Sequence, residues 1–240
     1  MEVPYMIIGI DASKTTSPTK TGIDKTAYHI ILELTKLDKV NTYYLYTKSP
    51  LDRALLQNKN ARERLIPFPR LWNRFRLPLA LLRDKPDVFI TLTTSLPPLS
   101  PKKSIVLIHD LAFKLFPEAY SKYALILQET AISIAKSRAK VIVFTSKANL
   151  DDFNKYCGKT DKTTAVIPLA YDSERFKLNI DAKKINGVNS PYLLFVGRLE
   201  KRKNVARIVE AFNKFKKENG TNHKLILCGK NGYGYKEIEE

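Results

Sequence analysis

The sequence predicts an α/β protein in which parallel strands alternate with amphipathic helices. Short apolar runs with the length of buried strands recur along the 240 residues, and helical periodicity follows most of them. A polar stretch over residues 171–190 interrupts this alternation, which restarts at Tyr192. We therefore expect a first domain over residues 1–170, a linker over 171–190, and the start of a second domain over 191–240.

The expected elements follow from the apolar pattern in chain order. Strands of the first domain are expected at residues 6–11, 42–47, 65–68, 87–92, 104–108, 141–145 and 163–167. Helices are expected from Gly22, over 71–83, over 122–137, and from Ser146 to about Tyr156. The helix over 71–83 carries Trp72, Phe75, Leu79 and Leu82 on one side. We interpret this stripe as a core face, with contact to a membrane surface as the alternative.

Charge and cysteine usage narrow the class of protein. The formal net charge of +17 attracts polyanions, but the charge is spread along the chain and no nucleic-acid module is recognisable. We therefore expect no specific nucleic-acid partner. Cys157 and Cys228 have neither metal nor disulfide spacing, and Cys228 is expected in a core. No run reaches the roughly 18 apolar residues that span a bilayer, so we expect a cytoplasmic protein, soluble or peripheral at the inner membrane face.

The stretch from Tyr192 to Asn204 has the pattern of an anion-binding turn. The run 192–196 predicts a fully buried strand, Gly197 ends it, and a helical stripe begins after Asn204. Between strand and helix lie four cations, Arg198, Lys201, Arg202 and Lys203. Free N–H groups at a helix N-terminus and the helix dipole favour a phosphate, to which Arg and Lys add donors. A solvated basic loop is the alternative interpretation.

Two other strand ends carry candidate site residues. The strand over 104–108 places His109 and Asp110 at its carboxyl end, the edge of an open α/β sheet where ligands bind. Gly22 lies between the first strand and the first helix, where a glycine lets the backbone approach a ligand closely. The alternatives are a hydrogen-bonded structural histidine and an ordinary turn glycine.

The segments around these residues resemble the retaining glycosyltransferases of the GT-B superfamily (glycosyl transferases group 1, family 4), which use nucleotide-activated sugars. Gly197-Arg198, followed after four residues by Lys203-Asn204, is similar to their donor-binding signature. Residues 21–28 resemble their glycine loop, and the run 108–113, Ile-His-Asp-Leu-Ala-Phe, resembles a recurrent segment that faces the donor sugar. The resemblance covers nearly the whole chain.

The resemblance implies a role for each candidate residue. Arg198 and Lys203 would bind the donor diphosphate, with Gly22 close to it, and His109 with Asp110 would be the catalytic residues near the sugar. It also implies the GT-B architecture: a complete N-terminal Rossmann-like domain on the acceptor side, followed by the start of a C-terminal Rossmann-like domain on the donor side. The second domain is short, which indicates C-terminal truncation and puts catalysis by the isolated chain in question.

The implied reaction is transfer of a sugar, of hexosyltransferase type, from a nucleoside diphosphate sugar to a hydroxyl acceptor. The acceptor would be a glycan or a lipid-linked molecule, which leaves peripheral membrane contact open, and the reaction would retain configuration without a metal or a further cofactor. Two alternatives remain: a non-catalytic remnant or half-enzyme that needs a partner, and a basic polyanion-binding protein. A dinucleotide-dependent dehydrogenase is disfavoured, because no Gly-x-Gly-x-x-Gly joins the first strand to its helix.

Overall fold

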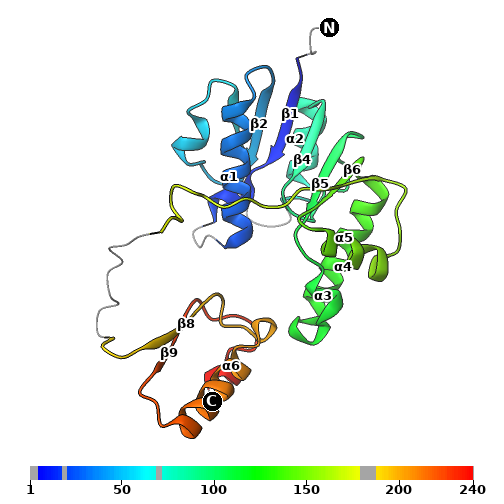
Figure 1. The fold of residues 1–240 in the computed structure, drawn as a ribbon. Coiled ribbons are helices and arrows are strands. Elements are labelled where there is room, and N and C mark those ends of the chain that lie inside the picture. Colours follow the sequence, from blue (N-terminus) through cyan, green and yellow to red (C-terminus); the bar gives the residue numbers. More distant parts are fainter. Residues whose placement is uncertain (1–4, 18–20, 69–71, 179–187, 240) are drawn as a thin grey trace. The chain divides into compact units, whose positions relative to one another are not determined.

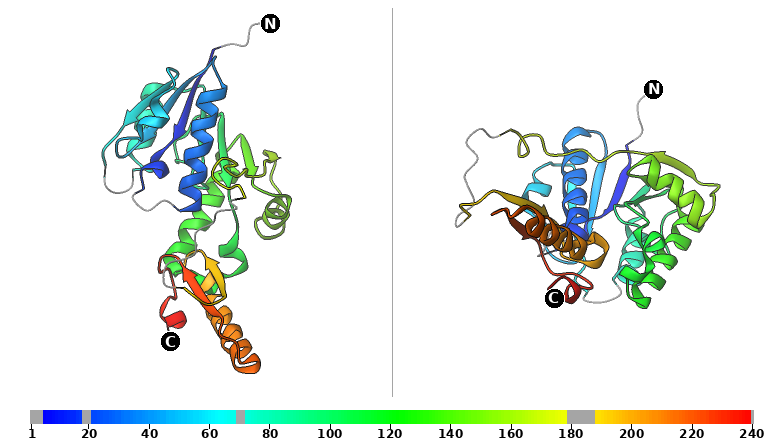
Figure 2. Two further views of the ribbon diagram at one scale, coloured as in Figure 1. Left: turned by 60° about the vertical axis from the view of Figure 1, so that its left-hand side comes forward. Right: turned by 60° about the horizontal axis from the view of Figure 1, so that its bottom comes forward.

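The computed structural model describes residues 5–17, 21–68, 72–178 and 188–239. It forms two compact units, one of residues 1–111 with 126–170 and the other of residues 112–125 with 171–240 (Figures 1 and 2). Of the predicted linker over 171–190, residues 179–187 lie outside the described part of the chain. The limits of the domains themselves, at residues 170 and 190, stay a prediction.

The first unit is built on a seven-stranded, entirely parallel sheet with the order β3-β2-β1-β4-β5-β6-β7. Its strands are β1 (Ile7–Asp11), β2 (Thr42–Thr47), β3 (Ala61–Leu65), β4 (Val88–Thr91), β5 (Ser104–Ile108), β6 (Val141–Phe144) and β7 (Thr163–Val166). The direction of chain progression reverses between β1 and β4, and all seven carboxyl ends lie at one edge. This is the predicted Rossmann-like α/β fold, and it creates a switch point for ligand binding.

Helices cover the sheet and build the core of the first unit. They are α1 (Gly22–Leu37), α2 (Arg76–Asp84), α5 (Lys147–Cys157) and the part of α4 (Lys122–Arg138) that begins at Ile126, with 3-10 turns η1 (Ser13–Thr16) and η2 (Arg53–Leu56). Residues 112–125, which belong to the second unit, contain α3 (Ala112–Leu115), η3 (Pro117–Ala119) and the start of α4. Figure 1 shows α1 lying along the sheet, where Ala27 and Ile31 pack with Ile10, Tyr43 and Leu45 in one buried cluster. These residues share one face of the sheet because side chains alternate along each strand.

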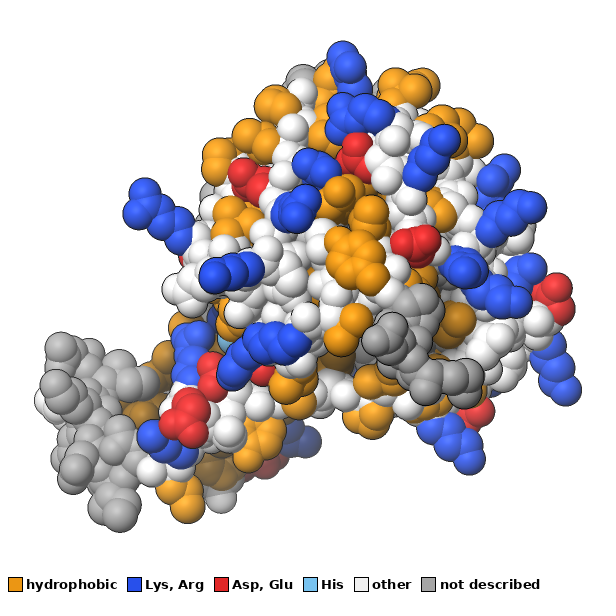
Figure 3. Space-filling model, turned by 90° about the horizontal axis from the view of Figure 1, so that it is seen from above, with side chains coloured by type: hydrophobic (Ala, Val, Ile, Leu, Met, Phe, Trp, Pro, Cys, Tyr) orange, Lys and Arg blue, Asp and Glu red, His pale blue; other side chains and the backbone are white. Residues whose placement is uncertain are grey.

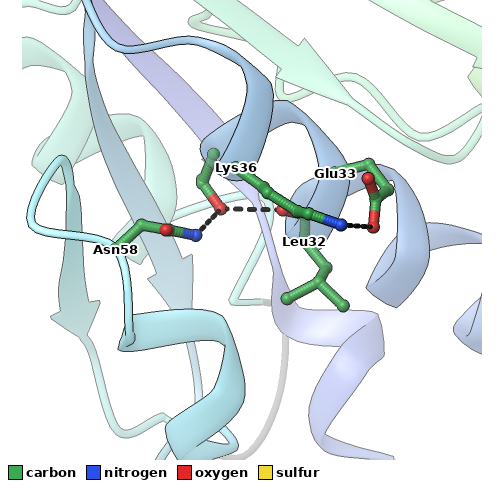
Figure 4. A network of polar contacts seen from close by, with 5 residues as sticks. Leu32, Glu33, Lys36 and Asn58 are labelled. Atoms are coloured by element: carbon green, nitrogen blue, oxygen red, sulfur yellow. Dashed lines mark hydrogen bonds and ion pairs between the residues drawn. The ribbon is translucent and has the colours of Figure 1, made fainter.

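The C-terminal half of α1 is tied to the segment that follows η2. Asn58 donates to the Thr35 hydroxyl at 3.2 Å, and that hydroxyl donates to the carbonyl of Leu32 at 3.1 Å (Figure 4). On the exposed side of the same turn, Lys36 lies 3.5 Å from Glu33. Thr35 is fully buried, so its hydroxyl needs these partners, and the chain between β2 and β3 is thereby held against α1.

Two sequence predictions are wrong in this unit. The third strand was expected at 65–68 but runs over Ala61–Leu65, because an edge strand of the sequence Ala-Arg-Glu-Arg-Leu needs no apolar run. The helix expected over 71–83 begins only at Arg76, with Pro78 in its first turn. In the first turn, backbone N–H groups have no acceptor within the helix, so the missing N–H of proline costs no hydrogen bond there. In a helix that began at residue 71, Pro78 would interrupt the backbone hydrogen bonds.

The predicted core face of that helix is also wrong. Trp72 is buried, but it precedes α2, and its indole donates to the carbonyl of Ile66 at 3.0 Å. Phe75, Leu79 and Leu82 are each more than half exposed. The buried face of α2 is instead Leu77, Pro78, Ala80 and Leu81. Leu79 and Leu82 therefore lie on the exposed side of α2.

The second unit contains a two-stranded parallel sheet. Its elements are β8 (Tyr192–Val196), η4 (Lys201–Lys203), α6 (Val205–Asn219), β9 (Lys224–Cys228) and the short α7 (Lys236–Glu239). The order strand, helix, parallel strand confirms the predicted start of a second Rossmann-like domain. The expectation of a fully buried β8 is wrong, since Leu193 and Leu194 are each 50% exposed, and Cys228 is exposed as well. Two strands and one long helix are too few to cover both faces of this sheet.

Candidate functional site

The carboxyl edge of the seven-stranded sheet gathers the candidate residues of the first unit. Asp11 ends β1 at the switch point, Thr91 ends β4, and His109 follows β5 directly. Asp11 is buried, and burial raises the pKa of its carboxyl, an effect that the hydrogen bond from Ser13 and the nearby Lys48 only partly offset. Asp11 was not among the predicted site residues, although the sequence shows a carboxylate at the end of the first strand.

His109 is fixed by hydrogen bonds on both its backbone and its ring. The Thr145 hydroxyl donates to its carbonyl at 2.9 Å, and the Asn149 amide donates to the preceding carbonyl of Ile108 at 2.7 Å. The ring atom Nε2 lies 2.9 Å from the carbonyl of Leu92. A carbonyl oxygen only accepts, so Nε2 carries a proton, and Nδ1 is the nitrogen left for another partner. His109 is half-buried and Asp110, next in the chain, is exposed.

Gly22 begins α1 at the same sheet edge, directly after a capped turn. Thr21 and Asp24 form a capping box, in which the Asp24 carboxylate accepts from the Thr21 backbone N–H at 2.8 Å. A Cβ atom added at Gly22 would have nothing within 4 Å, and the residue is exposed. Protein packing therefore does not require a glycine here, which leaves the space above the helix N-terminus open for a ligand. Residues 18–20 of the adjoining loop lie outside the described residues.

The candidate residues of the second unit lie on the loop between β8 and α6. This loop is hydrogen-bonded to the loop after β9: the Gly197 N–H donates to the carbonyl of Cys228, the Leu199 N–H to that of Lys230, and the Gly232 N–H to that of Leu199, all at 2.9 Å. The backbones are so close at Gly229 that an added Cβ would lie 1.6 Å from the Gly197 carbonyl oxygen. The two loops therefore form one rigid double turn at the carboxyl end of the sheet.

A buried carboxylate holds the base of this double turn. Glu200, whose side chain is 9% exposed, lies 3.3 Å from Nε of Arg198 and 3.1 Å from a terminal nitrogen of Arg202. Gly232 packs directly on it, because a Cβ at that position would come 2.6 Å from the Glu200 Cβ. The Arg198 side chain keeps 55% of its surface exposed, so it is oriented from one side and open on the other. Only one of its nitrogens is engaged by this contact, which leaves donors for a ligand.

Lys203 and the N-terminus of α6 complete the candidate anion site. Lys203 is exposed at the end of η4, and no carboxylate of the described residues lies within ion-pair distance of it. Lys201, by contrast, lies 2.9 Å from Glu237, a contact that raises the pKa of the lysine. Asn204 adopts a left-handed conformation with φ of 55°, and no side chain caps the following helix. The first N–H groups of α6 are therefore available to an anion.

The structure thus divides the predicted site residues between the two units. His109, Asp110 and Gly22 lie at the carboxyl edge of the first sheet, whereas Arg198 and Lys203 lie at the carboxyl edge of the second. In the described part of the chain, no three His, Cys, Asp or Glu side chains are placed to hold a metal ion together. No described helix is long and apolar enough to cross a membrane.

Residues 176–240, which include the whole double turn, match the sequence profile of the family Glycosyl transferases group 1. No curated protein matches the sequence significantly. The match covers β8, Arg198, Lys203 and α6, and it agrees with the resemblance found in the donor-binding signature.

Solved structures similar to the whole chain include three crystal structures of Anabaena HepE. In complex with UDP and glucose, HepE has a TM-score of 0.57 and 15% sequence identity, with 98% of this chain and 63% of HepE covered. The HepE complex with UDP-glucose has a TM-score of 0.54 and 13% sequence identity, and the match covers 94% of this chain and 69% of HepE. The HepE complex with UDP has a TM-score of 0.51 and 14% sequence identity, and the match covers 93% of this chain and 69% of HepE. The chain therefore has the GT-B fold and spans about two thirds of the length of these structures.

Proposed function

We propose that the chain acts in transferring a sugar from a nucleoside diphosphate sugar to a hydroxyl acceptor, and that Arg198 and Lys203 bind the donor diphosphate. The observation that carries this proposal is the double turn in the second unit. It combines a partly exposed guanidinium, an exposed ammonium and an uncapped helix N-terminus within the segment that matches the glycosyltransferase family. A diphosphate is the anion that suits this combination of a forked donor, a point charge and backbone N–H groups.

These groups match the demand of the chemistry. As the glycosidic bond of the donor breaks, the diphosphate gains negative charge, and donors that are already oriented stabilise it without reorganisation. Glu200 supplies that orientation for Arg198. In the first unit, we propose that Nδ1 of His109 meets the transferred sugar or the acceptor hydroxyl, with Asp110 beside it and Gly22 leaving room for the donor. Retention of configuration, a glycan or lipid-linked acceptor and a cytoplasmic location belong to this proposal as well.

A binding experiment tests the diphosphate role directly. UDP-glucose is the first donor to titrate, because HepE was crystallised with it. We expect Arg198→Ala and Lys203→Ala each to weaken binding by about tenfold or more, since a hydrogen bond to a charged group contributes ~1.5–3 kcal/mol. Lys216→Ala is the matched control, because this exposed lysine lies in the last turn of the same helix. Equal losses in all three variants, or no loss in the first two, would refute the proposal.

A second candidate function is a half-enzyme that is completed by a partner chain. The exposed apolar side chains of β8 favour it, because a strand of this composition is normally covered on both faces. In that case the isolated chain would bind the donor weakly and transfer no sugar, and addition of the partner would restore transfer. Sugar transfer by the isolated chain at a rate unaffected by any added protein would refute this alternative.

We also propose that α2 contacts an anionic membrane surface. Its exposed side carries Leu79 and Leu82 with Arg76 and Arg83, and the exposed Phe75 directly precedes it. A basic amphipathic helix of this kind lies in the interface plane of a bilayer. We expect Leu79→Gln with Leu82→Gln to abolish sedimentation with phosphatidylglycerol vesicles. Leu37→Gln with Val40→Gln, also exposed, is the control and should change nothing. Sedimentation that persists in the α2 variant would refute the contact.

A further inference from the structure

A basic pocket lies at the amino edge of the seven-stranded sheet, opposite the edge that carries His109. It has a volume of about 390 Å³, within the range of small-ligand sites, and it is formed where β5, β6 and β7 begin. Four cations line it: Lys102, Arg138, Lys140 and Lys162. Figure 3 looks down on the molecule from the end where β1 starts in Figure 1, and on this face Lys and Arg side chains outnumber Asp and Glu side chains.

The cations converge on the pocket from separate segments of the chain. Lys102 precedes β5, Arg138 ends α4, Lys140 precedes β6, and Lys162 precedes β7. A cation in the last turn of a helix is explained by the helix dipole, which accounts for Arg138 but not for the three lysines. Placing like charges around one cavity is unfavourable, so an arrangement of this kind is stabilised by an anion.

Little within the described protein neutralises these charges. Lys102, Arg138 and Lys140 have no carboxylate within ion-pair distance among the described residues. Asp161 also lines the pocket, but its side chain is 83% exposed and lies 3.4 Å from the ammonium of Lys162, so it offsets only one charge. The hydroxyl of Ser100, in the same lining, is buried without a hydrogen-bond partner among the described residues.

We propose that this pocket binds a phosphate group. A phosphate has several acceptor oxygens and carries up to two negative charges, which suits converging ammonium and guanidinium donors and would also give the Ser100 hydroxyl an acceptor. The inference does not depend on the proposed sugar transfer, because the pocket and the double turn lie in different units. The phosphate belongs either to a small soluble molecule or to a lipid headgroup, since both present the same chemistry to the pocket.

The test uses two probes. It also removes anion binding by the double turn, because the double turn is itself proposed to bind diphosphates. In the Arg198→Ala, Lys203→Ala background, inorganic pyrophosphate represents the soluble source. Dihexanoyl phosphatidylglycerol below its micelle concentration represents the headgroup. Calorimetric titration measures the affinity, and the amide NMR shifts of Lys140 and Thr163 locate the binding. We expect saturable binding of at least one probe with shifts at these two amides.

Charge variants decide whether the pocket is responsible. Arg138→Gln with Lys140→Gln is expected to weaken binding by about tenfold or more, while Lys25→Gln with Lys39→Gln, equal in charge but outside the pocket, leaves it within about twofold. Binding of pyrophosphate alone supports a soluble ligand, and binding of the lipid alone supports a headgroup. Absence of binding by both probes, or equal losses in the two variants at unchanged unfolding midpoints, overturns the proposal.

Discussion

Replacing Gly229 by alanine should disrupt the double turn while leaving the first unit intact. The added Cβ would lie 1.6 Å from the carbonyl oxygen of Gly197 and 2.6 Å from its carbonyl carbon. Even a close C–H···O contact needs about 3.3 Å between carbon and oxygen, so the two backbones would have to separate by more than about 1.5 Å. The neighbouring hydrogen bonds, from Gly197 to Cys228 and from Leu199 to Lys230, would be stretched beyond bonding distance.

The expected loss of stability follows from these contacts. Two backbone hydrogen bonds contribute about 1 kcal/mol each, and forced overpacking costs about 1–3 kcal/mol, which gives a loss of ~3–5 kcal/mol in the second unit. Hydrogen exchange measures this locally: the amides of Leu199 and Gly232 should exchange at least a hundredfold faster, whereas amides of β1 and β5 should not change. A two-stranded sheet has little stability in reserve, so the whole second unit is expected to open.

Gly22→Ala is the control for this experiment, because the chemical change is the same. Nothing lies within 4 Å of its added methyl group, and alanine at the first position of α1 is expected to be neutral or to stabilise the helix by up to about 1 kcal/mol. Unchanged exchange of Leu199 in Gly229→Ala would show that the two loops are not in contact in solution. If Gly22→Ala folds normally but loses UDP-glucose binding, the space above α1 is occupied by the donor.

Two further predictions concern the stability of the first unit. Burial raises the pKa of Asp38, but hydrogen bonds from Tyr43, Asn41 and nearby backbone outweigh this effect and lower the pKa to about 2. The stabilisation of the folded state by this carboxylate is therefore complete above the ordinary pKa of 3.8 and is lost as the pH falls through about 2. For this partly exposed carboxylate we expect a contribution of about 1 kcal/mol to the free energy of unfolding. Urea unfolding should therefore show a larger decrease in the free energy of unfolding between about pH 4.5 and pH 2 for the wild type than for Asp38→Asn. Equal decreases in the two proteins would contradict this expectation. Thr145→Val removes the donor to the His109 carbonyl and should lower the free energy of unfolding by ~1 kcal/mol, measured at neutral pH, and an unchanged value would mean that this hydrogen bond does not hold the histidine.

The sequence predicted the elements whose signal is local. Apolar runs located β1, β5 and β6 to within a residue or two, and Ser146, whose side chain caps the helix, marked the start of α5. The bounds of β3 were not predicted because this strand lies at the edge of the sheet, where its Arg and Glu side chains stay partly exposed. Such a strand needs no alternation of apolar residues. The exposed face of α2 was not predicted because this short helix carries apolar side chains on both sides, so its pattern does not show which side is buried.

The candidate site was predictable in its residues but not in its contacts. Strand ends and the donor-binding signature were enough to select His109, Gly22, Arg198 and Lys203. The clamp of Glu200 on Arg198, however, depends on Gly232 in the loop after β9, which only pairing of β8 with β9 brings close. The basic pocket likewise joins segments that are distant in sequence, so charge counting could indicate a polyanion but not its place.

The edges of the two sheets differ in a way that bears on self-association. In the first unit the outermost strands are β3, with its Arg-Glu-Arg run, and β7, which begins with two threonines, and charged or short polar edges resist pairing with another chain. In the second unit β8 pairs only with β9 among the described strands, and its sequence Tyr-Leu-Leu-Phe-Val is uncharged. Growth of β-aggregates in concentrated samples should therefore begin at β8, and a single lysine placed at Leu194 should slow it.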